Sequence, residues 1–202
     1  MPALLLVDIQ NDFLPGGALA VTHGDEVVAV ANELMPEYDL VIATQDWHPA
    51  DHQSFAAQHP GKQVGDMIQL QGLPQILWPV HCVQDTPGAQ LHPGLPGELV
   101  DVIMDKGLDP HSQGYSAFQD TGLAKLLRAD RVQHLVVVGL ATDYCVRNSV
   151  LDALREGFDV TVVRSGVRAV DLTPGDGERA LQEMHAAGAR LVADAADLVG
   201  DA

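Results

Sequence analysis

The sequence predicts an α/β protein with three layers, in which helices cover both faces of a doubly wound, mostly parallel six-stranded sheet. Six short runs are apolar without alternation, as in strands that are buried on both faces. Stretches with helical spacing lie between most of these runs. Hydrophobic residues make up 47% of the chain and aromatic residues only 4%, which suits helices packed on a sheet better than an aromatic-rich β-sandwich.

The elements can be justified in order along the chain. The expected strands lie at residues 3–7, 39–44, 101–105, 134–139, 159–163 and 189–193. The expected helices lie at about 25–36, 121–129, 144–156 and 176–187. The third helix has the clearest pattern, because Val146, Val150 and Ala153 share one face and Gly157 is well placed to end it. Alternation of strands and helices favours βαβ units, and hence a parallel sheet.

At 202 residues the chain has room for one sizeable core, so we expect a single domain over residues 1–202. The stretch at about 47–100 breaks the alternation and is rich in Pro, Gly, Gln and His. Long irregular segments are uncommon in compact domains and are more often functional than idle. No GxGxxG follows the first strand, so a dinucleotide site of the usual kind is not supported.

The formal net charge of −17 repels phosphate backbones and anionic lipids, so we expect neither nucleic acid nor a membrane as a partner. In the N-terminal MPALLLVDIQ, Asp8 interrupts the apolar run and no basic flank precedes it. The segment therefore reads neither as a signal peptide nor as a spanning helix. A cytoplasmic location is expected, with Cys82 and Cys145 both reduced.

Polar residues follow four of the expected strands. Asp8 ends the first, Asp46 follows the second, Lys106 follows the third, and Cys145 follows the fourth through the turn GLATDYC. Ligands of open α/β sheets bind beyond the carboxyl ends of the strands. These four side chains are therefore expected to converge on one edge of the sheet.

Cys145 is a candidate nucleophile, because free N–H groups and the positive end of the dipole at a helix start favour a thiolate. The alternative is a small buried hydrophobic residue. No histidine lies in the adjacent turn, so Asp8 and Lys106 are the candidate partners of the thiol. Asp8 could instead cap a loop, and Lys106 could be an ordinary surface lysine.

A second group combines one carboxylate with three imidazoles: Asp46, His48, His52 and His81. Such a set suits a divalent transition ion that keeps positions open to water. The alternative is a polar loop that happens to contain histidines, since no compact HxH or HExxH signature is present. The remaining histidines, read as solvated or supporting residues, are His23, His59, His92, His111, His134 and His185.

Taken together, five stretches resemble the nicotinamidases (pyrazinamidases) of the isochorismatase-like cysteine hydrolase superfamily. They are LLLVDIQNDFLPGGALAV, ATQDWHPADHQSF, WPVHCVQ, DKG and VVGLATDYCVRNSVLDAL. The resemblance runs from Pro2 to about Asp197 and implies the isochorismatase-like fold. It also implies that the 47–100 segment is a metal-binding insertion, because related isochorismatases and carbamoyl-sarcosine-type amidases lack the DxH…H…H set.

Carried over by position, the resemblance implies that Cys145 is the nucleophile, Asp8 the base and Lys106 the third member of a triad. It implies a cis peptide between Leu140 and Ala141, with the backbone N–H groups of Ala141 and Cys145 directed at the oxyanion. The implied reaction is hydrolysis of nicotinamide, and of pyrazinamide, to the acid and ammonia through a cysteine thioester. The implied role is salvage of nicotinamide toward NAD.

The resemblance further implies that Asp46, His48, His52 and His81 hold one divalent transition metal ion, which anchors the pyridine nitrogen. Zinc is the first candidate, and iron and manganese are the alternatives. Two other functions stay open: another small-amide cysteine hydrolase, such as a ureidoacid or carbamoyl amidase, and an inactive metal- or nicotinamide-binding protein. The oligomeric state is open between monomer and homo-oligomer. The expected walls of the substrate pocket are Phe13, Leu19, Trp78, Tyr115 and Tyr144.

Overall fold

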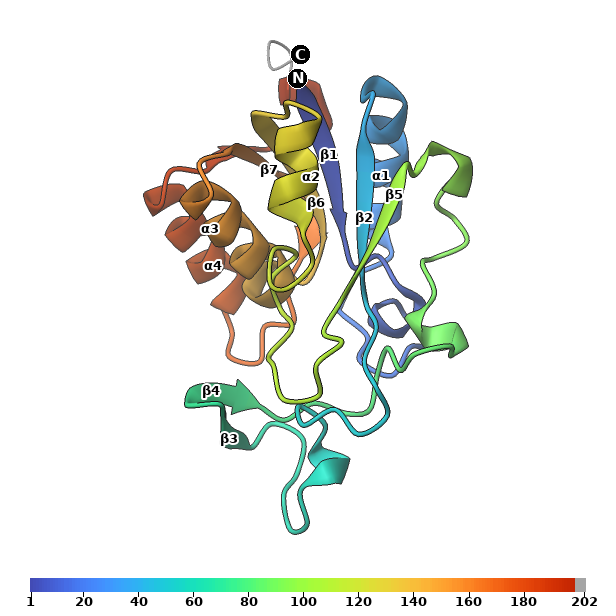
Figure 1. The fold of residues 1–202 in the computed structure, drawn as a ribbon, viewed down its shortest axis with the longest axis vertical. Helices are drawn as coiled ribbons and strands as arrows, with labels where there is room; N and C mark the ends of the chain where they lie inside the picture. Colours follow the sequence, from blue (N-terminus) through green and yellow to red (C-terminus); the bar gives the residue numbers. More distant parts are fainter. Residues whose placement is uncertain (199–202) are drawn as a thin grey trace.

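A computed structural model describes residues 1–198 and contains a six-stranded parallel sheet with helices on both faces (Figure 1). Its strands are β1 (Pro2–Val7), β2 (Val41–Asp46), β5 (Val102–Lys106), β6 (His134–Leu140), β7 (Asp159–Arg168) and β8 (Arg190–Val192). They lie in the order β5-β2-β1-β6-β7-β8, and each neighbouring pair is parallel. All six expected strands are present and the predicted fold class is confirmed. The last part of the predicted domain, 199–202, lies outside the described residues.

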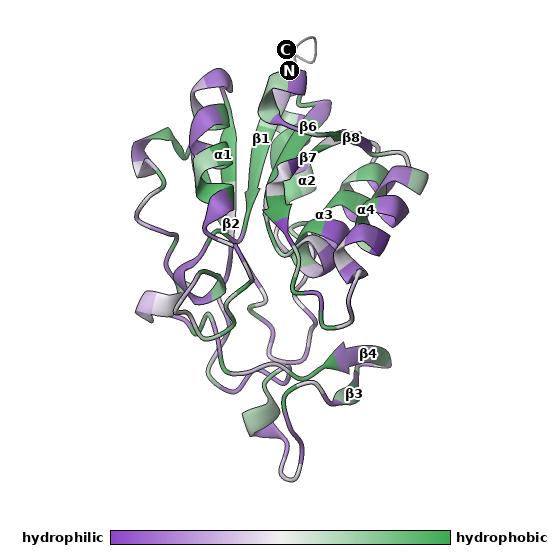
Figure 2. Cartoon of the chain, turned by 180° about the vertical axis from the view of Figure 1, so that it is seen from behind, coloured by the Kyte–Doolittle hydropathy of each residue, from purple (hydrophilic) through white to green (hydrophobic). Residues whose placement is uncertain are grey.

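Helix α1 (Glu26–Leu34) covers one face of the sheet, and α2 (Leu123–Ala129), α3 (Arg147–Arg155) and α4 (Asp176–Ala186) cover the other. On β1, Leu5 packs in the cluster that contains α2 to α4, whereas Leu4 and Leu6 pack in the cluster with α1. Both faces of the strand are buried, which explains its unbroken apolar run. Figure 2 shows hydrophobic central strands between helices whose outer faces are hydrophilic. Within residues 1–198, none of the helices has both the length and the apolar character to cross a bilayer.

The strand order reverses at β1. The chain moves from β1 through β2 to β5 on one side, and then continues with β6, β7 and β8 on the other. The carboxyl ends of β1 and β6 are therefore neighbours, with Val7 opposite Gly139. A Cβ at Gly139 would lie 2.1 Å from Val7 O, so only glycine fits at this approach. Such a switch point is where open α/β sheets bind their ligands.

The irregular segment contains an antiparallel hairpin, β3 (Met67–Leu70) and β4 (Leu73–Ile76), which the sequence analysis did not predict. Neither strand alternates clearly, and the turn depends on positive φ at Gln71 (49°) and Gly72 (81°), as in a type I′ hairpin. The hairpin lies at the carboxyl end of the main sheet (Figure 1). Short 3-10 turns occur at Asn11–Phe13, Met35–Glu37, Ala56–Gln58, Pro87–Ala89, Gly97–Leu99 and Ala195–Leu198.

Strand β7 extends to Arg168, beyond the expected end at residue 163. Its pairing with β6 shifts register between Val137 and Gly139 and then resumes with Gly139 opposite Val167. The polar residues after position 163 interrupt the apolar run, so periodicity could not identify the extension. The extension brings the segment after β7 up to the switch point.

Candidate active site

Asp8, Lys106 and Cys145, predicted from the strand ends, meet at the carboxyl edge of the sheet. Asp8 directly follows β1, Lys106 is the last residue of β5, and Cys145 lies in the turn after β6. Lys106 Nζ is 2.8 Å from Asp8 Oδ2 and 3.3 Å from Cys145 Sγ. All three residues are buried. Lys106 is therefore not a surface lysine, and the Asp8 carboxylate contacts the side chains of Thr44 and Lys106.

Four neighbours surround the ammonium of Lys106, which has three protons to donate. It donates hydrogen bonds to Asp46 Oδ1 (2.5 Å), Gly114 O (3.0 Å) and Cys145 Sγ, and it forms an ion pair with Asp8 Oδ2. Asp8 Oδ1 accepts a hydrogen bond from Thr44 Oγ1 at 2.6 Å, whereas Oδ2 receives none from residues 1–198. Asp8 Oδ2 is thus available to accept the proton of the nearby thiol.

The electrostatics of this cluster follow from burial. Burial raises the pKa of the Cys145 thiol well above its ordinary value, so the resting residue is a thiol that needs a base. Burial also raises the pKa of Asp8, against the opposing charge of Lys106, and so makes its carboxylate a better proton acceptor. Burial alone would lower the pKa of Lys106, but Asp46 and Asp8 outweigh it and raise that pKa. The ammonium therefore stays charged at neutral pH.

The turn after β6 differs in one respect from the expectation. The peptide bond between Leu140 and Ala141 is cis, as the resemblance implies. Residues Thr142–Val146, however, form a π turn, and α3 begins only at Arg147. The N–H of Val146 donates to Ala141 O, five residues back, at 3.1 Å. Cys145 therefore lies inside this turn rather than in the first turn of an α-helix.

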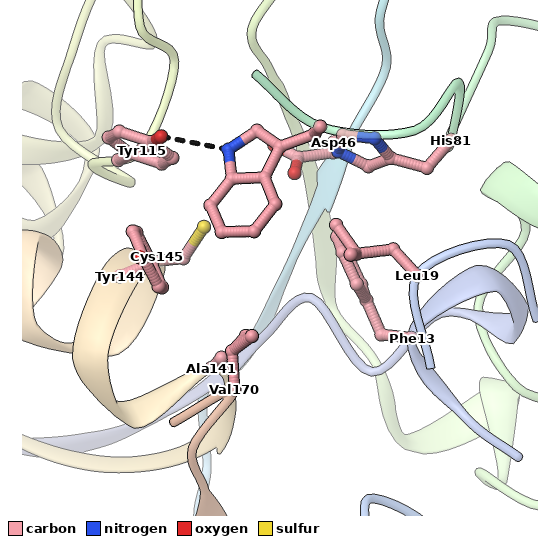
Figure 3. A pocket seen from close by; sticks show the side chains of 10 residues that line it. Phe13, Leu19, Asp46, His81, Tyr115, Ala141, Tyr144, Cys145 and Val170 are labelled. Atoms are coloured by element: carbon pink, nitrogen blue, oxygen red, sulfur yellow. Dashed lines mark hydrogen bonds between the residues drawn. The ribbon is translucent and has the colours of Figure 1, made fainter. Parts of the chain in front are cut away.

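A cavity opens next to Cys145 Sγ (Figure 3), with about 330 Å³ of empty space that includes the part open to solvent. The cavity is lined on one side by Cys145 and Ala141, from the turn after β6, and on another by Asp46 and His81, from the predicted metal group. One cavity thus contacts both predicted groups. All five predicted wall residues line it: Phe13, Leu19, Trp78, Tyr115 and Tyr144.

The aromatic wall of the cavity is held by direct contacts. The indole N–H of Trp78 donates to Tyr115 Oη at 2.9 Å, and Gln75 Nε2 donates to the same oxygen at 2.8 Å. The rings of Trp78 and Tyr144 meet edge to face, with centroids 4.8 Å apart. Gln75 belongs to β4, so the hairpin supports the wall through Tyr115.

Val170 also lines the cavity and was missed by the sequence analysis. It follows the unpredicted extension of β7, and no sequence signal connects it to the site. The carboxylate of Asp143, in the π turn, accepts the N–H groups of Val170 and Asp171 at 2.9 Å each. The turn that carries Cys145 therefore fixes this part of the wall.

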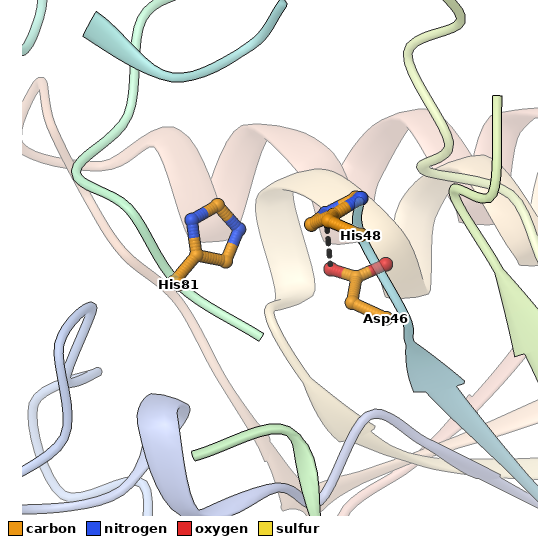
Figure 4. Close-up of side chains that lie close together, drawn as sticks. All are labelled: Asp46, His48 and His81. Atoms are coloured by element: carbon orange, nitrogen blue, oxygen red, sulfur yellow. Dashed lines mark ion pairs between the residues drawn. The ribbon is translucent and has the colours of Figure 1, made fainter. Parts of the chain in front are cut away.

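Three of the four residues of the second predicted group, Asp46, His48 and His81, lie together (Figure 4). They offer ligand atoms that all lie within 4.8 Å of one another, with His48 Nε2 3.6 Å from Asp46 Oδ2. His48 Nδ1 donates to Gly107 O at 2.9 Å, and His81 Nδ1 donates to Pro79 O at 2.7 Å. These bonds leave each Nε2 as the ring nitrogen that could bind a metal ion, an arrangement typical of metal-binding histidines.

His52 lies beside this group rather than within it. Its ring centroid is 4.1 Å from that of His48, and its Nδ1 pairs with Ser54 Oγ at 2.7 Å. Its Nε2 is buried without a hydrogen-bond partner among the described residues, which is costly unless a ligand satisfies the atom. Burial, with His48 nearby, lowers the pKa of His52 to about 3 and that of His81 to about 4. Neutral imidazoles with a carboxylate and an orphaned Nε2 fit a divalent metal ion.

Within residues 1–198, the cluster of Asp46, His48 and His81 includes none of the six histidines that we expected to be solvated or supporting. Cys82 and Cys145 are both unpaired, as expected. Cys82 lies next to His81, and burial raises its pKa far above the ordinary value. Burial raises the pKa of both thiols, and Cys145 differs from Cys82 in that the ammonium of Lys106 lies 3.3 Å from its sulfur.

The site combines a buried thiol with a carboxylate and an ammonium, and it lies at the switch point of a doubly wound sheet. Because the thiol also opens into an aromatic pocket, the site is of the cysteine hydrolase type. Comparison with known families agrees with this class. The Isochorismatase domain model matches residues 2–196, and the chain belongs to this family.

Similar proteins narrow the comparison. The nicotinamidase of Escherichia coli (strain K12) is 51% identical and is matched over 94% of this chain and 93% of that protein. Among solved structures, a nicotinamidase/pyrazinamidase of Acinetobacter baumanii is 40% identical, with a TM-score of 0.94 and 98% of each chain covered. A pyrazinamidase of Pyrococcus horikoshii in complex with zinc is 42% identical, with a TM-score of 0.80 and coverage of 95% of this chain and 98% of that one.

Proposed function

We propose that this protein is an amidohydrolase that converts nicotinamide to nicotinate and ammonia, and that it also accepts pyrazinamide. The observation that carries the proposal is that Cys145, with Asp8 and Lys106 around its sulfur, opens into the same aromatic cavity as Asp46 and His81. The 51% identity to the nicotinamidase of E. coli supports the choice of substrate.

In the first step Asp8 Oδ2 takes the proton of the Cys145 thiol as the sulfur attacks the amide carbon. Asp8 is suited to this because its Oδ2 receives no hydrogen bond and burial raises its pKa. Lys106 keeps its proton throughout and stabilises the negative charge that sulfur and carboxylate share. The proton therefore moves only between sulfur and Asp8 in this step.

The tetrahedral oxyanion is held by the backbone N–H groups of Ala141 and Cys145, and each such donor is typically worth about 3 kcal/mol in the transition state. Protonated Asp8 gives its proton to the departing nitrogen, the C–N bond breaks, ammonia leaves and a nicotinoyl thioester of Cys145 remains. Asp8 then deprotonates a water molecule that attacks the thioester. The C–S bond breaks, and the proton returns to sulfur as nicotinate leaves.

Asp46, His48, His52 and His81 would hold one divalent metal ion, and zinc is our choice because the similar pyrazinamidase of P. horikoshii was solved in complex with zinc. When bound, the ion would supply a coordination position for the ring nitrogen of the substrate. Phe13 and the other ring residues would flank the substrate and exclude water. The chain itself thus provides the thiol, the base and the aromatic walls.

We further propose that the enzyme works in the cytoplasm and supplies nicotinate for NAD salvage. The net charge of −17 disfavours binding to nucleic acid or anionic membranes. The substrate is a small neutral amide, so no macromolecular partner is required for turnover.

The test is ammonia release from nicotinamide by the purified, metal-replete protein. We expect turnover in wild type, loss of turnover in Cys145→Ala, and retention in Cys82→Ala, which removes the other buried thiol. Treatment with a chelator should lower the rate, and added zinc should restore it. If wild type releases ammonia from another small amide but not from nicotinamide, the chemistry stands and the substrate assignment is wrong.

A further inference from the structure

The ammonium of Lys106 lies at a position where a metal ion could also bind. Its four neighbours are Asp46 Oδ1 at 2.5 Å, Asp8 Oδ2 at 2.8 Å, Gly114 O at 3.0 Å and Cys145 Sγ at 3.3 Å. These four oxygen and sulfur atoms match the usual coordination number of zinc, which is four. The three side-chain donors, Asp8, Asp46 and Cys145, lie within 4.8 Å of one another, as the ligand atoms of the histidine group do.

Asp46 belongs to both groups. Its Oδ1 accepts from Lys106, and its Oδ2 faces His48 Nε2 at 3.6 Å. The structure therefore contains two adjacent cation positions that share one carboxylate. One is made of imidazoles, and the other contains the thiol. A thiolate is a softer and stronger ligand for zinc than a carboxylate. If nothing blocked the second position, a metal ion would therefore also bind the sulfur.

We propose that the ammonium of Lys106 is a fixed cation that keeps divalent metal ions off Cys145 and confines them to the histidine side of Asp46. Its importance for catalysis rests on the proposed function, because a metal-bound sulfur could not attack an amide. Which of the two cation positions binds a metal ion does not depend on whether the protein hydrolyses nicotinamide.

Charge and packing support this role. With Lys106 protonated, the two carboxylates, the thiol and the ammonium carry a net charge of −1; without it they carry −2, which a divalent ion would neutralise. Lys106 is 1% exposed, so its ammonium is buried between these neighbours. Gly114 closes the loop above it, since a Cβ there would lie 2.6 Å from the Cα of Gly107. A second divalent ion would thus meet a buried positive charge held by two carboxylates.

The test counts bound cadmium, a thiophilic probe whose bond to a thiolate gives an ultraviolet charge-transfer band. Wild type should bind one ion without this band. Lys106→Met, which removes the charge and keeps the length, should bind a second ion and show the band. The double variant Lys106→Met/Cys145→Ser should lose the band. Lys125→Met, at an exposed lysine of α2, is the matched control and should behave as wild type.

Two outcomes would overturn the proposal: a thiolate band in wild type at one equivalent of cadmium, or a folded Lys106→Met that binds one ion and shows no band. If Lys106→Met does not fold without metal, refolding it with two equivalents of cadmium and reading the same band gives the same decision. Nicotinamide turnover by wild type is measured separately. A failure there would reject the proposed function and leave the ion count unchanged.

Discussion

Gly107 packs directly against the ring of His48, so the substitution Gly107→Ala should displace this ring and weaken zinc binding by the predicted metal group. Gly107 O accepts the Nδ1–H of His48 at 2.9 Å, and the glycine has φ +66°. A Cβ at this position would lie 2.4 Å from His48 Cε1 and 2.6 Å from Nδ1. Because carbon atoms in contact are about 3.5–4.0 Å apart, the ring or the loop must move by more than about 1 Å.

Two effects contribute to the expected magnitude. The left-handed conformation costs a residue with a Cβ about 1–2 kcal/mol of stability. Displacement of the ring weakens the hydrogen bond that fixes the tautomer of His48, and the loss of such a supporting contact typically lowers metal affinity about 10–100-fold. We therefore expect a moderately destabilised protein whose zinc affinity falls by at least about tenfold.

Competition between the protein and a chromophoric chelator measures zinc affinity, and thermal unfolding without metal measures the backbone cost. Gly157→Ala is the matched control, because Gly157 has φ +88° but a Cβ there would meet no other part of residues 1–198 within 4 Å. Both variants should lose similar stability, and only Gly107→Ala should lose zinc affinity. Wild-type zinc affinity in Gly107→Ala, or an equal loss in Gly157→Ala, would refute the reasoning.

Three further substitutions test the supports of the site. Asp143→Asn should keep one of the two hydrogen bonds that Asp143 accepts and place an NH₂ group against the other backbone N–H. The free energy of unfolding should fall by about 1–3 kcal/mol, which urea unfolding would measure. KM for nicotinamide should rise as Val170 shifts, which steady-state kinetics would measure. Tyr115→Phe should leave the indole N–H of Trp78 without an acceptor and raise KM about tenfold with little change in kcat, so unchanged kinetics would contradict the supporting role of Tyr115. Gln10→Ala should also lower the free energy of unfolding, because the buried amide of Gln10 binds both the N–H and the carbonyl of Asp46 at 2.8 Å. A loss below about 1 kcal/mol in urea unfolding would argue against this role.

The sequence by itself determined the sheet and the identity of the polar groups at its edge. Strands buried on both faces need unbroken apolar runs, so β1 and β6 were visible without any structure. Parallel strands place their carboxyl ends at one edge, so Asp8 and Lys106 could be expected near Cys145. The resemblance predicted the five wall residues, which line the cavity, and the four candidate metal-site positions.

The tertiary structure alone decided how these groups divide their contacts. Asp46 was expected at the metal, but its second oxygen accepts from Lys106, a contact between residues 60 positions apart in the chain. Val170 reaches the pocket because pairing of β7 resumes after a register shift, and the β3–β4 hairpin depends on a left-handed turn at Gln71. These features arise from long-range pairing and from backbone conformations that apolar periodicity does not encode. The pattern of side chains therefore predicts which elements form, and only their packing determines which atoms meet.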